Sequence, residues 1–294
     1  MELITTLPAL PPRPEDGHKG MFGRLLIVGG SDEMIGAPVL AGTAALRMGA
    51  GLVQIAMPKS VLPVAISITP ELIGLGLGKG NNARLIEAAG KADALVIGPG
   101  LGQSTKSDDR LKELFRLEKP AVVDADGLNF LATRKKWPSR FKLQAVLTPH
   151  RGEMLRLAKL LGKSSVPTDD EGRIELAAAA AQAFGQIILL KGARTVVTDG
   201  QHAYVNHTGN SSLSKAGAGD VLSGMIGTLL AQKMTPFDAA CLAAHLHGRA
   251  GEIIGGQVGT RSVLAMEVAH AIPEALAEHE RNAPAREMSA AGQQ

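Results

Sequence analysis

The chain has 294 residues, of which 45% are hydrophobic and 20% charged, a composition typical of a globular protein with a substantial core. Its net charge of +3 is too small and scattered for a nucleic-acid footprint, and an aromatic content of 3% argues against base-stacking platforms. We therefore expect neither nucleic acid nor a membrane as a partner.

The ends of the chain and its cysteine content bound the domain organisation. Residues 1–18 carry acids and prolines rather than an apolar core, which predicts an N-terminal extension and not a signal peptide. No linker divides residues 19–279, so we expect one domain there and a flexible polar tail over 280–294. The single cysteine, Cys241, lies in an apolar helical run as a small core residue, which fits a reducing, cytoplasmic compartment.

Short apolar runs alternate with helical stretches from residue 24 to residue 190. The runs predict buried strands at 24–30, 52–57, 94–97, 121–123, 145–147 and 187–190, with helices at 37–50, up to 117, up to 161, and at 171–184. Residues 71–79 are interrupted by glycines and receive no assignment. Strands that alternate with helices predict βαβ units and a mostly parallel sheet.

The pattern changes after residue 194. Residues 195–198 and 203–206 flank Asp199-Gly200, a turn typical of a β-hairpin, and helices follow at 220–233, 236–254 and 262–278. The sequence therefore predicts a three-layer α/β/α fold whose mostly parallel sheet is closed on one edge by an antiparallel hairpin.

Residues 210–220 bring small side chains and two glycines directly before an apolar helix. Their backbone N–H groups coincide with the positive end of the helix dipole, an arrangement that binds anions. Asp220 lies at the edge of this hole, where we expect the first helical turn to keep its carboxylate ionised. The alternative is a glycine-rich helix cap without a ligand.

Other polar residues follow the predicted strands, where parallel sheets bind ligands. They are Gly98-Pro99-Gly100-Leu101-Gly102, Asp124-Ala125-Asp126, Thr148-Pro149-His150 and Lys191-Gly192. Each has a structural alternative: a simple turn for the glycines, a helix cap for Asp126 and a hydrogen-bonded strand end for His150. Lys191 is the hardest to explain this way. Together with residues 210–220, these strand ends predict one shared site.

Common nucleotide and metal motifs are incomplete. Residues 29–36 lack the dinucleotide fingerprint, and Gly162-Lys163-Ser164 follows a helix and lacks the first glycine of a P-loop. His245 and His247, two residues apart on a helix, cannot share a face as metal ligands. We therefore assign no residue as a metal ligand.

Gly217-Ala218-Gly219-Asp220 before a long helix resembles the Gly-x-Gly-Asp motif of the ribokinase-like superfamily. An ordered set of motifs resembles the ADP- or ATP-dependent NAD(P)H-hydrate dehydratases over residues 19–270. The set is Lys19-Gly20-x-x-Gly23, Gly98-Pro99-Gly100-Leu101-Gly102, Asp124-Ala125-Asp126-Gly127-Leu128-Asn129, Leu147-Thr148-Pro149-His150-x-Gly152-Glu153 and Leu190-Lys191-Gly192. The resemblance implies a ribokinase-like fold, a homo-oligomer, specifically a tetramer, and repair of hydrated nicotinamide cofactors.

The resemblance also implies a reaction and its residues. ADP would drive the dehydration of the S-epimer of hydrated NAD(P)H, releasing AMP and phosphate, with Mg²⁺ bridging the nucleotide phosphates. Asp220 would be the catalytic base, and the N–H groups of Gly217, Ala218 and Gly219 would hold the charge of the moving phosphoryl group. The implied nucleotide-binding residues are Lys191, Gly192, Ala193, Arg194, Thr195, Gly217, Ala218 and Gly219, and those for the hydrated cofactor are Ala37, Gly100, Gly102, His150 and Asp220.

The chain departs from the family pattern at two positions. Ala216 replaces a glycine and Lys215 a threonine, and Lys215 could face either the phosphates or solvent. The epimerase domain of some family members is expected to be absent, because too little chain precedes Lys19. Two other functions stay open: a vitamin kinase of the same superfamily, acting on a hydroxymethylpyrimidine, a thiazole or pyridoxal, and a non-catalytic dinucleotide-binding regulator.

Overall fold

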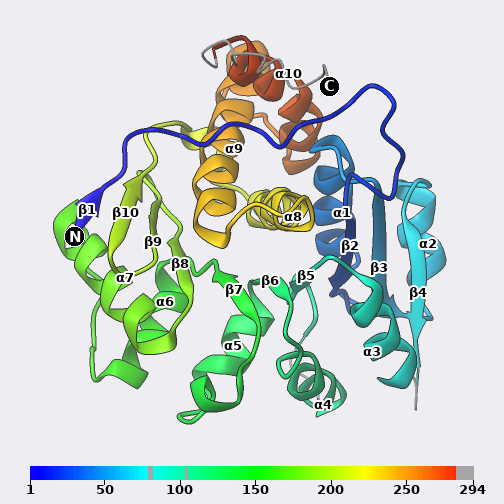
Figure 1. Ribbon diagram of the computed structural model, residues 1–294, viewed down its shortest axis with the longest axis horizontal. Coiled ribbons are helices and arrows are strands. Elements are labelled where there is room, and N and C mark those ends of the chain that lie inside the picture. The colour runs from blue at the N-terminus through cyan, green and yellow to red at the C-terminus, as the bar shows by residue number, and fades with distance from the viewer. Residues whose placement is uncertain (79–81, 103–104, 283–294) are drawn as a thin grey trace, which may run out of the picture.

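A ten-stranded sheet runs through the centre of the computed structural model, which describes residues 1–78, 82–102 and 105–282 (Figure 1). Its strand order is β1-β10-β9-β8-β7-β6-β5-β2-β3-β4. The strands are β1 (Glu2–Leu3), β2 (Arg24–Val28), β3 (Leu52–Pro58), β4 (Ile73–Leu77), β5 (Ala94–Ile97), β6 (Pro120–Val123), β7 (Gln144–Leu147), β8 (Ile187–Leu190), β9 (Val196–Thr198) and β10 (His202–Val205). Neighbouring strands are parallel except on either side of β9, so β9 alone among these strands runs against the others.

The predicted strands and the antiparallel hairpin are confirmed, with one difference at each edge. β1 pairs in parallel with β10, so the hairpin lies one strand inside the edge, and two residues of the predicted extension join the sheet. At the other edge the unassigned residues 71–79 contain β4, whose glycines at 74 and 76 hide the strand pattern. The predicted domain limits stay predictions, and residues 283–294 of the predicted tail lie outside the described residues.

Helices cover both faces of the sheet (Figure 1). One layer contains α1 (Gly36–Arg47), α2 (Leu62–Ile68), α8 (Ala218–Ala231), α9 (Pro236–Val258) and α10 (Ala265–Asn282). The other contains α3 (Asn82–Lys91), α4 (Thr105–Leu114), α5 (Asp126–Ala132), α6 (Arg151–Ala158) and α7 (Asp170–Phe184). Short 3-10 turns connect elements at η1 (Pro138–Arg140), η2 (Lys159–Leu161) and η3 (Ser211–Leu213). None of the described helices has both the length and the apolar character that crossing a bilayer requires.

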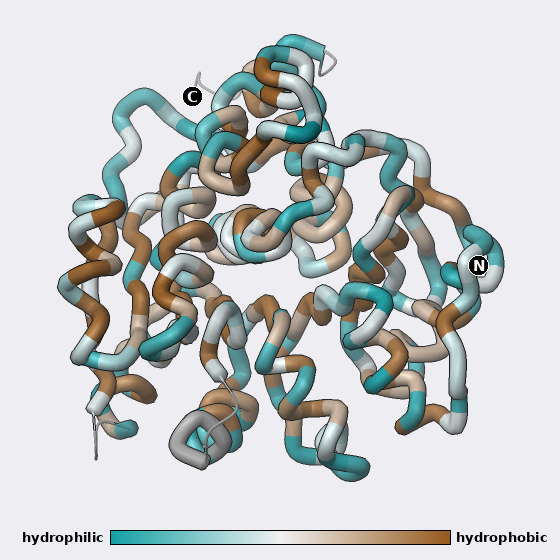
Figure 2. Tube along the Cα trace, turned by 180° about the vertical axis from the view of Figure 1, so that it is seen from behind, coloured by the Kyte–Doolittle hydropathy of each residue, from teal (hydrophilic) through white to brown (hydrophobic). Residues whose placement is uncertain are grey.

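Successive strand residues enter two separate cores because each strand is buried on both faces. In β2, Leu25 and Ile27 pack toward α1 and α8, whereas Leu26 and Val28 pack toward the opposite helix layer. Figure 2 shows the hydrophobic stretches gathered along the strands and the hydrophilic ones at the outer turns. Cys241 is buried in the first core, as expected.

Helices α1 and α8 approach each other unusually closely. A side chain at Gly224 would collide with the Ala41 carbonyl oxygen, and the Thr228 hydroxyl donates to the Ala45 carbonyl at 3.2 Å. Because α1 carries Ala37 and α8 carries Asp220, this contact sets the spacing between two predicted site residues.

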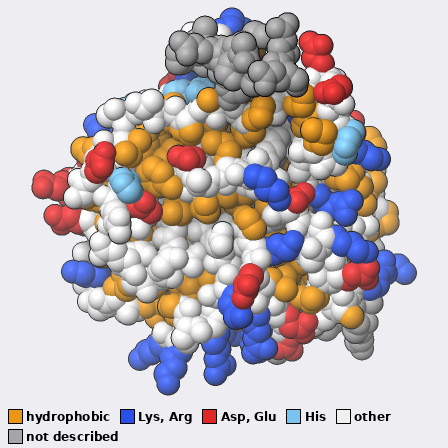
Figure 3. All heavy atoms as spheres, in the orientation of Figure 1, with side chains coloured by type: hydrophobic (Ala, Val, Ile, Leu, Met, Phe, Trp, Pro, Cys, Tyr) orange, Lys and Arg blue, Asp and Glu red, His pale blue; other side chains and the backbone are white. Residues whose placement is uncertain are grey.

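Charge on the surface is mixed in sign. Figure 3 shows Lys and Arg side chains gathered along the lower edge of one face, with acidic side chains interspersed elsewhere. The exposed pairs Lys91–Glu87 and Lys112–Asp109 are examples of this interspersion.

Candidate active site

The start of α8 is shaped by the backbone of Gly217. This residue adopts φ +91°, and a Cβ there would lie 2.6 Å from Leu40 of α1, so only glycine fits. The N–H of Ala218 donates to the Lys215 carbonyl at 3.4 Å. The first-turn N–H groups of Gly219 and Asp220 have no intrahelical acceptor by helix geometry, which makes them the anion-binding donors of this turn.

Asp220 is mostly buried in that first turn. Burial, reinforced by the nearby Asp124 carboxylate and only partly opposed by Lys191, raises the pKa of Asp220 to about 7 from its ordinary 3.8. The expected full ionisation of this carboxylate is therefore not met: with a pKa of about 7 it is about half protonated at neutral pH, and desolvation is the largest cause. A carboxyl group with a pKa near 7 is suited to exchange a proton at neutral pH.

Lys191 lies between two acidic residues below the α8 terminus. Its ammonium donates to Asp124 Oδ1 at 2.8 Å and lies 4.0 Å from Glu153 Oε2, and it is 3.2 Å from the position of a Cβ on Gly219. Burial lowers the pKa of Lys191, but the two carboxylates outweigh this and the pKa is raised. The ammonium is therefore charged, and an added side chain at Gly219 would crowd it.

Asp124 is 2% exposed and holds this arrangement together. Its Oδ2 accepts from the Ser223 hydroxyl at 2.7 Å, and its Oδ1 accepts from the Ala125 N–H at 2.9 Å. Burial raises the pKa of Glu153, and the Asp124 charge adds to this against the opposing effect of Lys191. We call Asp124, Glu153, residues 191–195 and residues 217–220 the lysine side.

A buried arginine shapes the loop after β8. The Arg173 guanidinium, on α7, donates to the carbonyls of Ala193 at 2.8 Å, Arg194 at 3.0 Å and Leu190 at 3.3 Å. It is 8% exposed. Arg194 has φ +57°, rare for a residue with a side chain, and its side chain also pairs with Asp170 at 2.9 Å. Arg173 therefore holds residues 191–195 in a conformation that they would not adopt alone.

The glycine loop after β5 forms the other part of the site, with little side-chain charge. Gly100 has φ +61°, and a Cβ there would lie 2.7 Å from the Met34 carbonyl and 3.0 Å from the Ala37 Cβ. The Gly102 N–H donates to Asp126 Oδ2 at 2.8 Å. We call Ala37, residues 98–102 and Asp126 the glycine side.

Asp126 is not the cap of α5, which begins after Ala125. Its second oxygen accepts from the Asn129 amide at 3.2 Å, so both oxygens are used to position the glycine loop. Ala125 has φ +47° and separates the two aspartates: Asp124 contacts Lys191, and Asp126 contacts Gly102.

His150 has the structural role that the sequence left open. It is the N-cap of α6, with Nδ1 accepting from Gly152 N–H at 2.9 Å and its own N–H donating to Glu153 at 2.8 Å. It also lines the main cavity beside Lys191. A structural role therefore does not remove it from the site.

The main cavity, of about 960 Å³, opens on the lysine side. Every predicted nucleotide-binding residue except Gly217 lines it, together with His150. Lys215 also lines the cavity, but its ammonium donates to the Arg261 carbonyl at 2.6 Å and is exposed. The contacts of Ala37, Gly100 and Gly102 place them together on the glycine side, with Leu40 of the same helix against Gly217.

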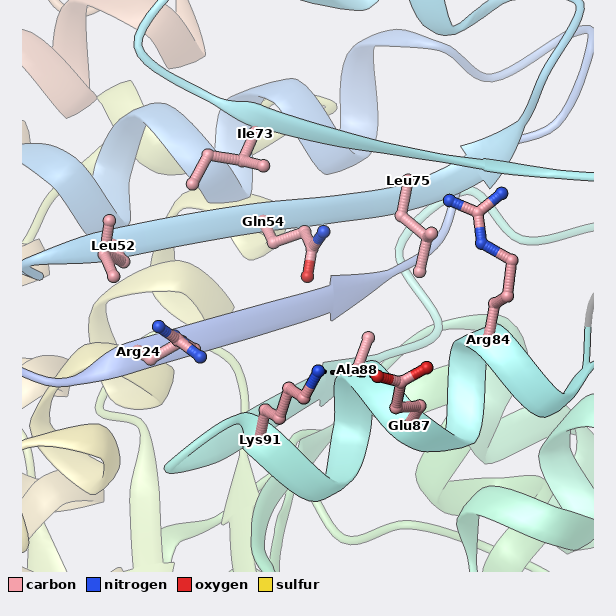
Figure 4. A pocket seen from close by; sticks show the side chains of 9 residues that line it. All are labelled: Arg24, Leu52, Gln54, Ile73, Leu75, Arg84, Glu87, Ala88 and Lys91. Atoms are coloured by element: carbon pink, nitrogen blue, oxygen red, sulfur yellow. Dashed lines mark hydrogen bonds and ion pairs between the residues drawn. The ribbon is translucent and has the colours of Figure 1, made fainter.

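A second cavity, of about 340 Å³, lies at the opposite ends of the strands, between β2–β4 and α3 (Figure 4). Arg24, Arg84 and Lys91 lie at its rim over Leu52 and other apolar residues, and Lys91 pairs with Glu87. The amino ends of parallel strands are not where such sheets bind ligands, and no predicted site residue lines this cavity.

Five residues that the structure brings to the site receive no role from the sequence. Asp124 and Glu153 belonged to recognised motifs but had no assigned role, whereas Ser223, Arg173 and His247 stood in helices without any distinguishing pattern; His247 lines the main cavity. Only Asp124, placed directly after a buried strand, carried a signal that could have found it.

Comparisons with known proteins show which family the chain resembles. The family model for NAD(P)H-hydrate dehydratase matches residues 25–274. The ADP-dependent (S)-NAD(P)H-hydrate dehydratase of Neisseria meningitidis is 39% identical over 266 residues, covering 88% of this chain and 86% of that protein. The bifunctional NAD(P)H-hydrate repair enzyme Nnr of Moorella thermoacetica is 43% identical over 91% of this chain, which spans only 52% of that relative. The chain thus spans about half the length of its bifunctional relatives.

Solved structures share the whole fold. An ADP/ATP-dependent NAD(P)H-hydrate dehydratase from Bacillus subtilis, co-crystallised with ATP/Mg²⁺, superimposes with a TM-score of 0.78 at 31% identity and covers 92% of this chain and 94% of its own. A ribokinase-like superfamily protein of Enterococcus faecalis has the same TM-score at 24% identity and 92% coverage of both chains, which confirms the predicted ribokinase-like fold.

Proposed function

Because this chain belongs to the NAD(P)H-hydrate dehydratase family, we propose that it returns hydrated NADH or NADPH to the intact cofactor at the expense of ADP or ATP. The observation that carries the proposal is the Asp220 carboxyl. It has a pKa of about 7, lies in the first turn of α8, and is close to both Lys191 and the free first-turn N–H groups.

The chemistry requires a better leaving group than hydroxide. The hydroxyl oxygen of the hydrated ring attacks the terminal phosphorus of ADP, the bond from that phosphorus to AMP breaks, and Asp220 takes the hydroxyl proton. The bond between the ring carbon and the oxygen of the new phosphate ester then breaks, and its electron pair leaves with the phosphate. The neighbouring ring carbon loses a proton, which restores the double bond. The products are NAD(P)H, AMP and phosphate; with ATP, ADP replaces AMP.

The lysine side suits the phosphoryl transfer, which depends on positioning and charge stabilisation. The N–H groups of Gly219 and Asp220 would hold phosphoryl oxygens, and the Lys191 ammonium would add positive charge. Residues 191–195, held by Arg173, would bind the rest of the nucleotide along the main cavity.

Three carboxyl groups, Asp124, Glu153 and Asp220, surround one ammonium, and this donor chemistry fits a divalent cation that arrives with the nucleotide. The described residues contain no cluster of three His, Cys, Asp or Glu for a metal held by protein alone. When bound, Mg²⁺ would neutralise the nucleotide phosphates, which would supply most of its ligands, and Glu153 is the carboxyl group available to hold it besides the proposed base.

The glycine side would bind the hydrated cofactor. Gly102, where an added Cβ would meet only Ser31 at 3.6 Å, leaves the backbone open to a bulky dinucleotide. Gly100 lets the loop pack directly against Met34 and Ala37, and Ala37 adds only a methyl group there. We assign the S-epimer, His150 as a further contact, a cytoplasmic location and a tetramer on the same family grounds; light scattering would measure the subunit number.

The proposal is tested by following the recovery of reduced-nicotinamide absorbance. Purified protein with Mg²⁺ should restore NADH from hydrated NADH with ADP or ATP, and release AMP from ADP only when the hydrate is present. Parallel reactions with ATP and hydroxymethylpyrimidine, thiazole or pyridoxal test the vitamin-kinase alternative. AMP release without hydrate, or no recovery with either nucleotide, would contradict the proposal.

A further inference from the structure

Three of the six phenylalanines and the single tryptophan of the chain line a pocket that the proposed chemistry does not use. This aromatic pocket, of about 300 Å³, lies between the C-terminal end of α4 and residues 130–141. None of its described lining residues lines the main cavity. A ligand in the aromatic pocket would therefore occupy a site separate from that of the proposed reactants.

Aromatic rings form the floor of the pocket. The ring centroid of Phe115 lies 5.6 Å from that of Phe130 and 5.1 Å from that of Phe141, and the Trp137 ring lies 5.0 Å from that of Phe141. At such distances aromatic rings attract one another. Phe130 and Phe141 are 8% and 9% exposed. The rings therefore hold one another in place, and the exposed parts of Phe130 and Phe141 belong to an apolar floor.

Basic side chains form the rim of the pocket. Of the described residues that line it, none is Asp or Glu, and half are Lys or Arg. The Arg134 guanidinium carbon lies 3.5 Å from the centroid of the Phe130 ring. Figure 3 shows basic side chains along the lower edge of the molecule, where Figure 1 places α4 and α5. The basic lining residues are Lys112, Arg116, Arg134, Lys136 and Arg140.

Three of these cations are available to a ligand. Arg116, Lys136 and Arg140 are exposed and form no ion pair within the part of the chain that the structure describes, whereas Lys112 pairs with Asp109 at 2.8 Å. Like charges that share a rim repel one another, and a bound anion would offset this repulsion. Guanidinium groups suit a phosphate, because their N–H donors match its oxygens in pairs.

The size of the pocket limits the ligand. A volume of about 300 Å³ is at the lower end for small-molecule sites and suits one ring better than an extended chain. We propose that the aromatic pocket binds a small phosphate ester that carries an aromatic ring. The ring would lie on the floor and the phosphate at the rim, so this is a second ligand site of the protein.

Trp137 makes the proposal directly testable, because it is the only tryptophan in the chain and lines the pocket. Its fluorescence should change saturably when phenyl phosphate, a minimal ligand of this class, is added to the purified protein. Inorganic phosphate has no ring and benzyl alcohol has no charge, so each should bind about tenfold more weakly. Saturating ADP should leave the titration unchanged, because Trp137 does not line the main cavity.

Arg140→Gln tests the rim, with Lys135→Gln as the matched control. Both residues are exposed cations of the same segment, but Lys135 does not line the pocket. Arg140→Gln should weaken phenyl phosphate binding about tenfold, the effect of one lost charge-assisted hydrogen bond, and Arg116→Gln should act in the same way. Lys135→Gln should change the affinity by less than about twofold.

Several results would overturn the proposal. An unchanged Trp137 emission in wild-type protein would show that the rings and cations serve only the fold. Equal binding of inorganic phosphate or of benzyl alcohol would remove the need for the ring or for the charge. Equal effects of Arg140→Gln and Lys135→Gln would leave only the general charge of the surface. Loss of the signal in saturating ADP would place the ligand in the main cavity. The wild-type titrations need no variant, so they decide the matter even if a variant does not fold.

Discussion

On the lysine side, charged side chains determine the geometry of the site: Asp124 and Glu153 flank Lys191. Arg173 holds the carbonyl of Leu190 at the end of β8 and two carbonyls of the loop that follows it. On the glycine side the chain presents mainly backbone, with Asp126 holding the Gly102 N–H. Each arrangement suits the step that we propose for that side of the site. Charge must be stabilised where a phosphoryl group moves, whereas a large dinucleotide needs open backbone and space. Changes of charge should therefore damage the first side, and changes of volume the second.

The largest effect should come from Asp220→Asn. Loss of the base should reduce kcat by about 10² to 10⁴, because the ring hydroxyl keeps its proton during attack. The thermal midpoint at pH 8 should be unchanged or higher, since a buried carboxylate has been removed. Kinetics and thermal melting measure the two effects. Near-normal turnover would remove Asp220 from the base role.

The pH dependence should report the same carboxyl. With a pKa of about 7 in the free enzyme, kcat/KM should fall about tenfold per unit as the pH is lowered below 7. Between pH 4 and 7 the folded protein holds a proton that the unfolded chain has lost, so the contribution of Asp220 to the free energy of unfolding declines as the pH rises toward 7. Asp220→Asn should remove this decline in denaturant titrations. A kcat/KM that is flat from pH 5 to 8 would contradict the assignment.

Arg173→Ala tests whether the lysine side depends on a residue that need not touch the nucleotide. It leaves three carbonyls without their donor, so ADP affinity should fall about tenfold and the free energy of unfolding by about 2–4 kcal/mol. Calorimetry and denaturant melts measure the two. Arg173→Lys keeps the charge but not the fork of donors, and should recover stability better than ADP affinity. Unchanged ADP binding in Arg173→Ala would show that residues 191–195 need no such support.

Gly100→Ala tests the glycine side, with Gly162→Ala as the control. Both residues have positive φ, +61° and +72°, but a Cβ at Gly162 meets nothing within 4 Å, whereas at Gly100 it meets Met34 and Ala37. Each change should cost about 1–2 kcal/mol of backbone strain. Only Gly100→Ala should raise the KM for hydrated cofactor, by about fivefold to tenfold, with ADP affinity unchanged. Equal effects of both variants would mean that the packing of the loop against Met34 and Ala37 does not shape the cofactor site.

Local pattern was enough to predict every strand except β1 and β4, the hairpin, and the glycine-rich turn before α8. Those features depend on neighbours in sequence: apolar runs, the Asp199-Gly200 turn, and glycines before an apolar helix. β4 was not predicted because Gly74 and Gly76 interrupt its apolar pattern, although Leu75 and Leu77 are buried.

Neither the pKa of Asp220 nor the contacts that hold the loop after β8 could be predicted from local sequence pattern. The pKa of Asp220 depends on Asp124, which is 96 residues away, and on burial that only the packed helices create. Arg173 reaches the loop after β8 from an alanine-rich helix, where an arginine usually faces solvent. Family resemblance carried the assignment of roles further than the residues alone, and those roles stay predictions for this chain.

The close contact at Gly224 lies one helical turn beyond Asp220 and touches neither proposed reactant. Since α8 carries the proposed base and α1 carries Ala37, the width of this contact sets the distance between the proposed base and the proposed cofactor site. Because Gly224 has no side chain, α8 lies directly against the backbone of α1 at Ala41. Any larger residue at position 224 would increase that distance without replacing a residue of either proposed binding surface.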